Sequence, residues 1–207
     1  MTTEGPDTEQ PSRRTGVVVA AATGVAILVL AVVLGPMIVD QATEANIPPA
    51  PTGPNLASVD LREDIPNSEV SADIDYPEVP PDGGDHDEQW LSCGLYAKAV
   101  REENAVHSLE RGAVWITYDP EEISRKQAKA MFDQLPEDKG IVSPYVGLPG
   151  NVVLSVWGAQ LQLLSPDDPR FDLFLEEYGD GHLAPEPDAG CADGVVEYEK
   201  KGGGAPE

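Results

Sequence analysis

The longest uninterrupted run of apolar positions extends from Gly16 to Val39 and contains no charged residue. At about 1.5 Å per residue, a helix of this length spans the roughly 30 Å hydrocarbon core of a bilayer. The run also lacks the polar face that an amphipathic helix of a soluble core would show. The pattern therefore predicts a transmembrane helix over residues 16–39, with the lipid bilayer as its partner.

Charges on either side of this run set its expected orientation. Arg13 and Arg14 precede the run, whereas Asp40 and Glu44 follow it. Positive charge is retained on the cytoplasmic side of single spans. We therefore predict a single-pass protein of the cell membrane, with residues 1–15 as a cytoplasmic tail and the C-terminal part extracytoplasmic.

Two alternatives to an anchor remain open. A cleaved signal peptide would have a shorter apolar core and a small-x-small cleavage site, and the nearest candidate, Ala42 to Ala45, contains Glu44. A twin-arginine export signal would use Ser12-Arg13-Arg14, but Gly16 stands where such signals have a bulky apolar residue. The length of the apolar run favours the uncleaved anchor.

The region after the predicted span is acidic and rich in proline. Residues 40–88 contain 13 acidic residues and one basic residue, Arg62, and their apolar positions follow no regular period. Like-charged, proline-rich chain stays extended and solvated. Residues 40–74 are therefore predicted to be a linker. Dense apolar positions from Trp90 to about Leu183 indicate a small extracytoplasmic domain over residues 75–192, followed by a disordered tail, 193–207.

The first elements of this domain follow from caps and β-branched runs. Asn104 is a candidate cap for a short helix, 105–111, that stops at Gly112, and residues 113–118 form a β-branched and aromatic strand. Asp119-Pro120 has the cap-and-proline pattern of a helix start, and Pro136 ends that helix. These patterns predict alternating strands and helices.

The second half of the domain contains a hairpin and a clear amphipathic helix. Residues 152–157 and 160–164 are predicted strands joined by a Gly158-Ala159 turn, and residues 141–146 form a strand that Pro144 places at an edge. A last helix begins at Asp168-Pro169. The expected fold class is α+β: a small, mainly antiparallel sheet with two to three helices packed on one face.

Net charge and cysteine content narrow the possible partners. The chain has a net charge of -24, so binding to a nucleic-acid backbone is disfavoured. Cys93 and Cys191 lie near the two ends of the domain, in a compartment expected to be oxidising. A disulfide is favoured, and two free thiols acting as metal ligands are the alternative.

A long ordered set of motifs runs through the domain. The set contains Pro80-Pro81-Asp82-Gly83-Gly84-Asp85-His86, Trp90, Cys93-Gly94-Leu95-Tyr96, Val106 to Tyr118, Ser143-Pro144-Tyr145, Gly147-Leu148-Pro149, Trp157-Gly158, Asp167-Asp168-Pro169-Arg170 and Pro185-Glu186-Pro187. In these motifs the chain resembles the DUF3105 family over about residues 75–192. The resemblance implies a bacterial and often membrane-anchored protein, and the family has no established activity to carry over.

One motif within this resemblance suggests metal chemistry. The family pattern around His107 reads His-Ser-Leu-Glu-His-Gly, which resembles the His-x-x-Glu-His motif of inverted zinc peptidases. In this chain position 111 is Arg, and a guanidinium stays protonated and does not bind metals. The second histidine ligand of the motif is therefore missing.

A reduced metal site remains conceivable. His86, His107 and Glu110, with Asp85, could hold one transition-metal ion, the only cofactor that the sequence suggests. In the alternative interpretation, which Arg111 favours, these residues serve ordinary hydrogen bonding, and His182 is a solvated charge beyond a helix end.

Function therefore stays open between three hypotheses at this point. The first is a non-enzymatic extracytoplasmic domain that binds a ligand or an envelope protein. The second is a metal-dependent surface enzyme or metal-binding protein that uses His86, His107 and Glu110. The third is a structural component of the envelope. We favour a binding or structural module over an enzyme.

Overall fold

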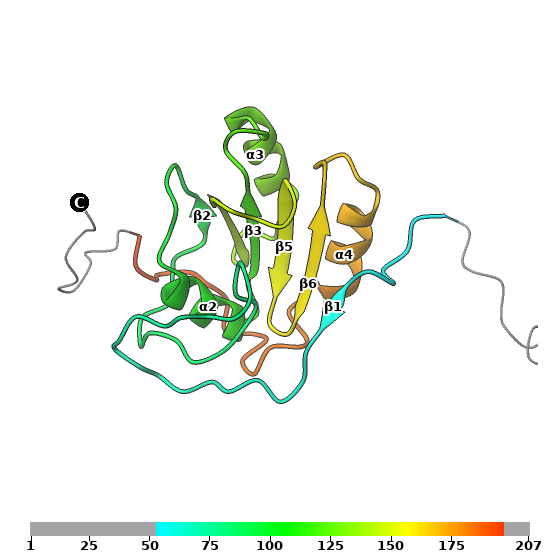
Figure 1. Ribbon diagram of the computed structural model, residues 1–207. Helices are drawn as coiled ribbons and strands as arrows, with labels where there is room; N and C mark the ends of the chain where they lie inside the picture. The colour runs from blue at the N-terminus through cyan, green and yellow to red at the C-terminus, as the bar shows by residue number, and fades with distance from the viewer. Residues whose placement is uncertain (1–52, 197–207) are drawn as a thin grey trace, which may run out of the picture. The chain divides into compact units, whose positions relative to one another are not determined.

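The computed structural model describes residues 53–196, in which one six-stranded sheet is flanked by three helices (Figure 1). Across the sheet the strand order is β1-β6-β5-β3-β4-β2. In chain order the elements are β1 Asp60–Leu61, β2 Gly94–Leu95, α2 Glu102–Glu110, β3 Val114–Tyr118, α3 Arg125–Phe132, β4 Gly140–Pro144, β5 Val152–Val156, β6 Ala159–Leu163 and α4 Arg170–Tyr178.

The sheet is mixed rather than mainly antiparallel. Strands β1, β6, β5 and β3 pair antiparallel in that order, whereas β4 runs parallel to both β3 and β2. The parallel pair arises because α3 connects β3 to β4 as a crossover, which parallel neighbours require. The α+β class is thus confirmed, with a mixed sheet in place of the predicted one.

The two faces of the sheet bury separate apolar clusters. On β3, Val114 and Ile116 belong to a cluster with α3 and α4, while the intervening Trp115 belongs to a second cluster with α2. Successive strand residues point to opposite faces, so α2 lies on the face opposite α3 and α4. The prediction that all helices cover one face is therefore wrong.

The predicted hairpin is present, with its turn one residue earlier than expected. Strands β5 and β6 pair Val156 with Ala159, so Trp157-Gly158 forms the two-residue turn. Gly158 has φ +71°, and a Cβ at this position would lie 2.8 Å from the carbonyl oxygen of Arg62. Glycine is needed at this position both for its backbone conformation and for space.

Helices α3 and α2 do not begin at the cap residues that the sequence predicted. Helix α3 starts after Ser124, which forms a capping box with Gln127, whereas the Asp119 side chain accepts a hydrogen bond from the Glu121 amide in a preceding turn. Helix α2 starts after Arg101, and the Asn104 side chain instead donates to the carbonyl of Gln89. Helix α4 begins close to the predicted Asp168-Pro169 start, and the Asp168 side chain accepts a hydrogen bond from the Arg170 amide.

Strand β4 is not an edge strand, although it contains Pro144. Strand β2 lies outside it but pairs only with Ile141 and Val142. Pro144 therefore lies beyond the pairing with β2, where its missing N–H breaks no ladder hydrogen bond on that side.

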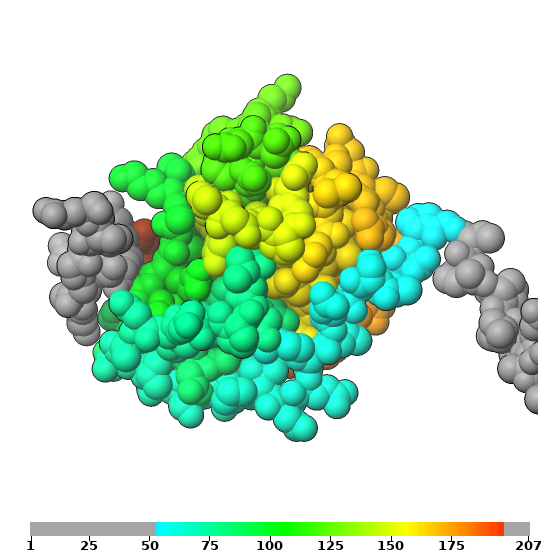
Figure 2. All heavy atoms as spheres, in the orientation of Figure 1, coloured from blue at the N-terminus to red at the C-terminus, as the bar shows by residue number. Residues whose placement is uncertain are grey.

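The chain before Trp90 contributes more to the fold than a linker would. Strand β1 extends the sheet beside β6, and Glu69 pairs with His86 in an isolated bridge. In Figure 2 this part of the chain, coloured cyan to teal, forms a band across the lower side of the visible face. The folded unit thus begins earlier than the predicted boundary at residue 75.

The C-terminal end of the folded unit is held by the predicted disulfide. Cys93 and Cys191 are bonded, with Cα atoms 5.1 Å apart. The segment beyond Cys191 continues this contact, since the Val195 amide donates to the carbonyl of Trp90 at 2.9 Å. Val195, predicted to belong to a disordered tail, therefore pairs with the domain.

Within residues 53–196, no helix has both the length and the apolar character needed to cross a membrane. The predicted span, Gly16 to Val39, lies outside the described residues, as do the predicted cytoplasmic tail and the first part of the linker.

Candidate metal centre

His86 lies on an irregular segment that is fixed to the rest of the domain through its backbone. Its amide donates to the carbonyl of Ser68 at 3.0 Å, and its carbonyl accepts from the amide of Val70 at 2.7 Å. The preceding Gly83 and Gly84 have φ values of +153° and +136°. Glycines permit this backbone path, which leads the imidazole of His86 into the interior, where it is 1% exposed.

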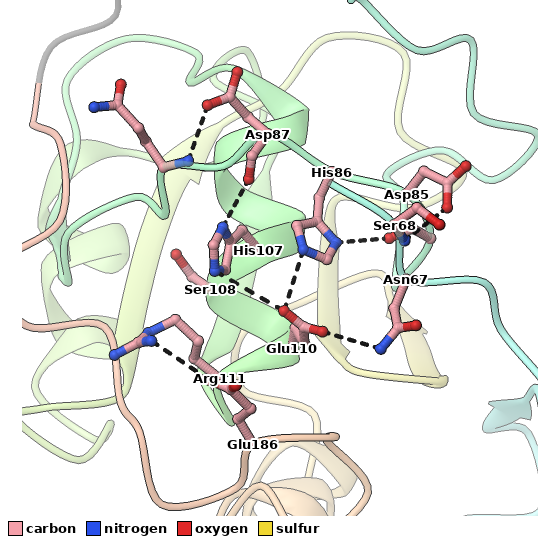
Figure 3. A network of polar contacts seen from close by, with 12 residues as sticks. Asn67, Ser68, Asp85, His86, Asp87, His107, Ser108, Glu110, Arg111 and Glu186 are labelled. Atoms are coloured by element: carbon pink, nitrogen blue, oxygen red, sulfur yellow. Dashed lines mark hydrogen bonds and ion pairs between the residues drawn. The ribbon is translucent and has the colours of Figure 1, made fainter. Parts of the chain in front are cut away.

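His107 and Glu110 lie on α2, one turn apart. Residues at i and i+3 share a helix face, so both side chains project toward His86 (Figure 3). The His107 side chain is 8% exposed and that of Glu110 is 13% exposed. Two separate elements thus bring three side chains that can bind a metal into one buried place.

The three side chains converge on a small volume. One ligand atom of His86, one of His107 and one of Glu110 all lie within 4.8 Å of one another. The Glu110 Oε2 atom is 3.1 Å from His86 Nε2 and 3.9 Å from His107 Nε2. Ligands of a tetrahedral zinc ion, bound at about 2.0–2.1 Å, stand roughly 3.3 Å apart, so these atoms need to close by no more than roughly 1.5 Å.

Hydrogen bonds on the far side of each ring determine which nitrogen carries the proton. His86 Nδ1 is 2.9 Å from the carbonyl of Gly84, and His107 Nδ1 is 2.7 Å from the carbonyl of Asp87. A carbonyl only accepts, so each Nδ1 is the donor. In the neutral ring Nε2 then carries a lone pair, and both lone pairs face the Glu110 carboxylate. Metal-bound histidines use this same carbonyl arrangement.

The surroundings favour a neutral imidazole at His107. Burial lowers the pKa of His107, and the nearby His86 ring and Arg111 guanidinium act in the same direction, against the Asp87 carbonyl and the Glu110 carboxylate. A neutral histidine is the form that binds metal ions. When both rings are neutral, two acceptor nitrogens and an anionic oxygen meet at this point, and a cation bound between them would stabilise the cluster.

Arg111, the residue that replaces histidine in the motif, is directed away from this cluster (Figure 3). Its Nε donates to the carbonyl of Gly190 at 2.9 Å, and its guanidinium lies 4.0 Å from the centre of the Trp90 ring. The Trp90 ring meets His107 edge-on at 5.7 Å. Arg111 therefore holds the segment before Cys191, and its charge does not point between the three candidate ligands.

Other candidates from the sequence lie outside the cluster. The Asp85 side chain accepts from the Ser68 amide at 2.9 Å, so it supports the loop. His182 lies past α4, where its exposed ring binds Asp180. The Ser108 hydroxyl is buried and donates to the carbonyl of Leu91. Of the four proposed ligands, His86, His107 and Glu110 come together and Asp85 does not.

One member of the site could not be found from the sequence. Asn67 Nδ2 donates to Glu110 Oε1 at 3.1 Å, across 43 positions of sequence. Asn67 lies in the acidic, proline-rich stretch, where neither periodicity nor a motif distinguishes it. Backbone pairing between residues 68–70 and His86 brings it to the site, and such pairing leaves no local sequence signal.

Comparison with known families agrees with this domain. The chain matches the family described as "Protein of unknown function (DUF3105)" over residues 68–193, and it belongs to that family. This match contains all three converging residues and both cysteines. No curated protein and no solved structure matches the chain.

Proposed function

We propose that this chain is a membrane-anchored protein whose extracytoplasmic domain binds one transition-metal ion through His86, His107 and Glu110. The observation that carries the metal site is the convergence of their three ligand atoms within 4.8 Å. Two imidazoles and one carboxylate form a set typical of zinc, and each imidazole is oriented by a backbone carbonyl. Burial lowers the pKa of His107, which favours the neutral ring that binds a metal ion.

The charge of the domain supports a cation as the ligand. The chain carries 37 acidic and 13 basic residues, which concentrates cations near its surface. A pocket of about 500 Å³ beside Trp90 is lined by Glu69, Glu88 and Asp193 among other residues. Glu69 pairs with His86 through the backbone, and Trp90 contacts His107, so this acidic pocket lies beside the cluster.

Metal analysis of the purified full chain tests the proposal. After removal of bound metal with a chelator and dialysis against zinc, we expect one zinc per chain by mass spectrometry, provided the affinity tag contains no histidine. His107→Ala should lose this zinc, because a site with two remaining ligands binds weakly. His182→Ala, a change at an exposed histidine, is the matched control and should retain it.

Thermal unfolding gives an independent readout of the same site. A ligand that binds only the folded state stabilises it by about 2.7 kcal/mol at a concentration 100 times its Kd. Added zinc should therefore raise the Tm of the wild type and of His182→Ala, and leave that of His107→Ala unchanged. A wild-type Tm that does not respond to zinc, copper or cobalt would remove the metal site.

The membrane placement has its own test. The apolar run Gly16 to Val39, with Arg13 and Arg14 before it, supports an anchor with its N-terminus in the cytoplasm. In intact cells stripped of any outer barrier, added protease should cleave the chain after residue 39 and leave an N-terminal tag protected. Recovery of the chain from the soluble fraction, or protection of the C-terminal part, would contradict the anchor.

A further inference from the structure

The second carboxylate oxygen of Glu110 is held by a neighbour outside the ligand set. Oε2 faces the two histidines, while Oε1 accepts the hydrogen bond from Asn67 Nδ2 at 3.1 Å (Figure 3). We infer that Asn67 is a positioning residue that holds Glu110 as a one-oxygen ligand and thereby sets which metal the site prefers. This inference rests on the proposed function.

The segment that contains Asn67 is hydrogen-bonded to the segment that contains His86. The Ser68 amide donates to the Asp85 carboxylate at 2.9 Å, and the Ser68 carbonyl accepts from the His86 amide at 3.0 Å. One short segment therefore fixes His86 through the backbone and Glu110 through the Asn67 side chain. Two of the three ligands depend on it, although it contributes no ligand itself.

The hydrogen bond has a consequence for coordination number. A carboxylate with one oxygen engaged by an amide donor offers a single oxygen to the metal, so the protein supplies two nitrogens and one oxygen. With one solvent molecule this makes a four-coordinate tetrahedral site, which suits zinc and cobalt. Manganese and calcium prefer more oxygen ligands, and calcium commonly takes both carboxylate oxygens. Freeing Oε1 should therefore shift the preference toward such ions.

Asn67 is well placed for mutation, because it is exposed and its loss opens no buried cavity. In Asn67→Ala, Glu110 is free to turn and to bind a metal through both oxygens. Asn67→Asp keeps the shape but replaces the donor with a second carboxylate. Asn67→Gln retains an amide donor at slightly greater reach. Asn151→Ala removes an exposed amide that binds the carbonyl of Leu164 and is the matched control.

Cobalt and zinc titrations of the metal-free full chain provide the test. We expect the wild type and Asn151→Ala to give the intense visible absorption of tetrahedral cobalt. Asn67→Ala should lose much of this intensity and bind zinc about tenfold more weakly, the scale expected for a lost outer hydrogen bond. The ratio of zinc affinity to manganese affinity should also fall in Asn67→Ala. Asn67→Asp should show the same changes. Asn67→Gln, which retains an amide donor, should keep part of the visible cobalt absorption.

The outcomes separate this inference from the proposed function. Stoichiometric cobalt in the wild type, with an identical spectrum and zinc affinity in Asn67→Ala, would overturn the role of Asn67 and leave the metal site standing. A loss of zinc affinity with no change in the cobalt spectrum or the zinc-to-manganese ratio would overturn the role in metal preference. A wild type that binds no cobalt would overturn the site and this inference together.

Discussion

Removal of the Cys93–Cys191 disulfide is expected to lower the free energy of unfolding by about 4 kcal/mol. The bond joins residues 98 positions apart, so it closes most of the domain into one loop. In the chain-entropy account, a loop of roughly 100 residues restricts the unfolded chain enough to contribute about 4–5 kcal/mol. For a domain of this size, that is a large share of a total stability of about 5–15 kcal/mol.

The variant Cys93→Ala/Cys191→Ala measures this contribution without introducing a buried hydroxyl, because Cys191 is fully buried. Urea unfolding followed by tryptophan fluorescence reports on the right region, since Trp90, Trp115 and Trp157 all lie in the folded unit. Reductant should destabilise the wild type by a similar amount and leave the double variant unchanged. A difference below about 1 kcal/mol would mean that the unfolded chain is already compact without the bond.

The hairpin and the disulfide could be predicted because their signals are local or compositional. Short runs of β-forming residues on both sides of Gly158 define two strands and a turn. The two cysteines of the chain, near the two ends of the predicted domain, allow only one pairing within the chain. Neither inference required knowledge of how distant segments pack.

The starts of α3 and α2 were harder to predict because a residue that can cap a helix is not always used as its cap. Asp119-Pro120 and Ser124 with Gln127 both favour a helix start, and the strand end at Tyr118 leaves Asp119 in a turn instead. Asn104 could cap a helix at 105, yet α2 begins at Glu102 and uses Asn104 to bind the loop at Gln89. Tertiary contacts decide between such signals, and they cannot be seen in a single sequence.

The candidate site also has parts that could be predicted from the sequence and parts that could not. The types of residue that could bind a metal were evident from the sequence, since three of the four named side chains do converge. Two features were not evident from the sequence. The Arg111 guanidinium packs on the Trp90 ring, away from the candidate ligands, and the Asn67 side chain donates a hydrogen bond to Glu110. Both depend on segments more than 20 residues away, at Trp90, Gly190 and Asn67.

Two acceptor nitrogens against a carboxylate are a costly arrangement for a metal-free protein. Each Nδ1 proton is committed to a carbonyl, so neither Nε2 can donate to Glu110 unless the ring takes a second proton. Burial lowers the pKa of His107 and favours its neutral ring, whose Nε2 then faces the Glu110 carboxylate as a second acceptor. A site of this kind gives up stability in the empty state in favour of binding, as functional sites often do.

Glu110→Gln is therefore expected to abolish metal binding and to stabilise the metal-free domain. Oε1 of the glutamine can keep the hydrogen bond from Asn67, while its amide nitrogen replaces Oε2 at 3.1 Å from His86 Nε2. A clash of two acceptors becomes a donor–acceptor pair, for which we expect about 1 kcal/mol at pH 8. The amide carries no charge and its nitrogen has no lone pair for the ion. Zinc affinity should therefore fall at least about 100-fold, the upper end of the loss caused by removing a mere outer-shell partner.

Urea unfolding in chelator at pH 8, beside zinc titration by calorimetry, measures both effects on one protein. Glu110→Ala should lose zinc in the same way without gaining stability, because it offers His86 no donor. Glu186→Gln, at a more exposed glutamate that pairs with Arg111, should change neither property appreciably. If Glu110→Gln instead lowers stability in chelator, then His86 and Glu110 form an ion pair around a bound proton. The cluster would then hold the fold together, with no place between its side chains for a metal ion.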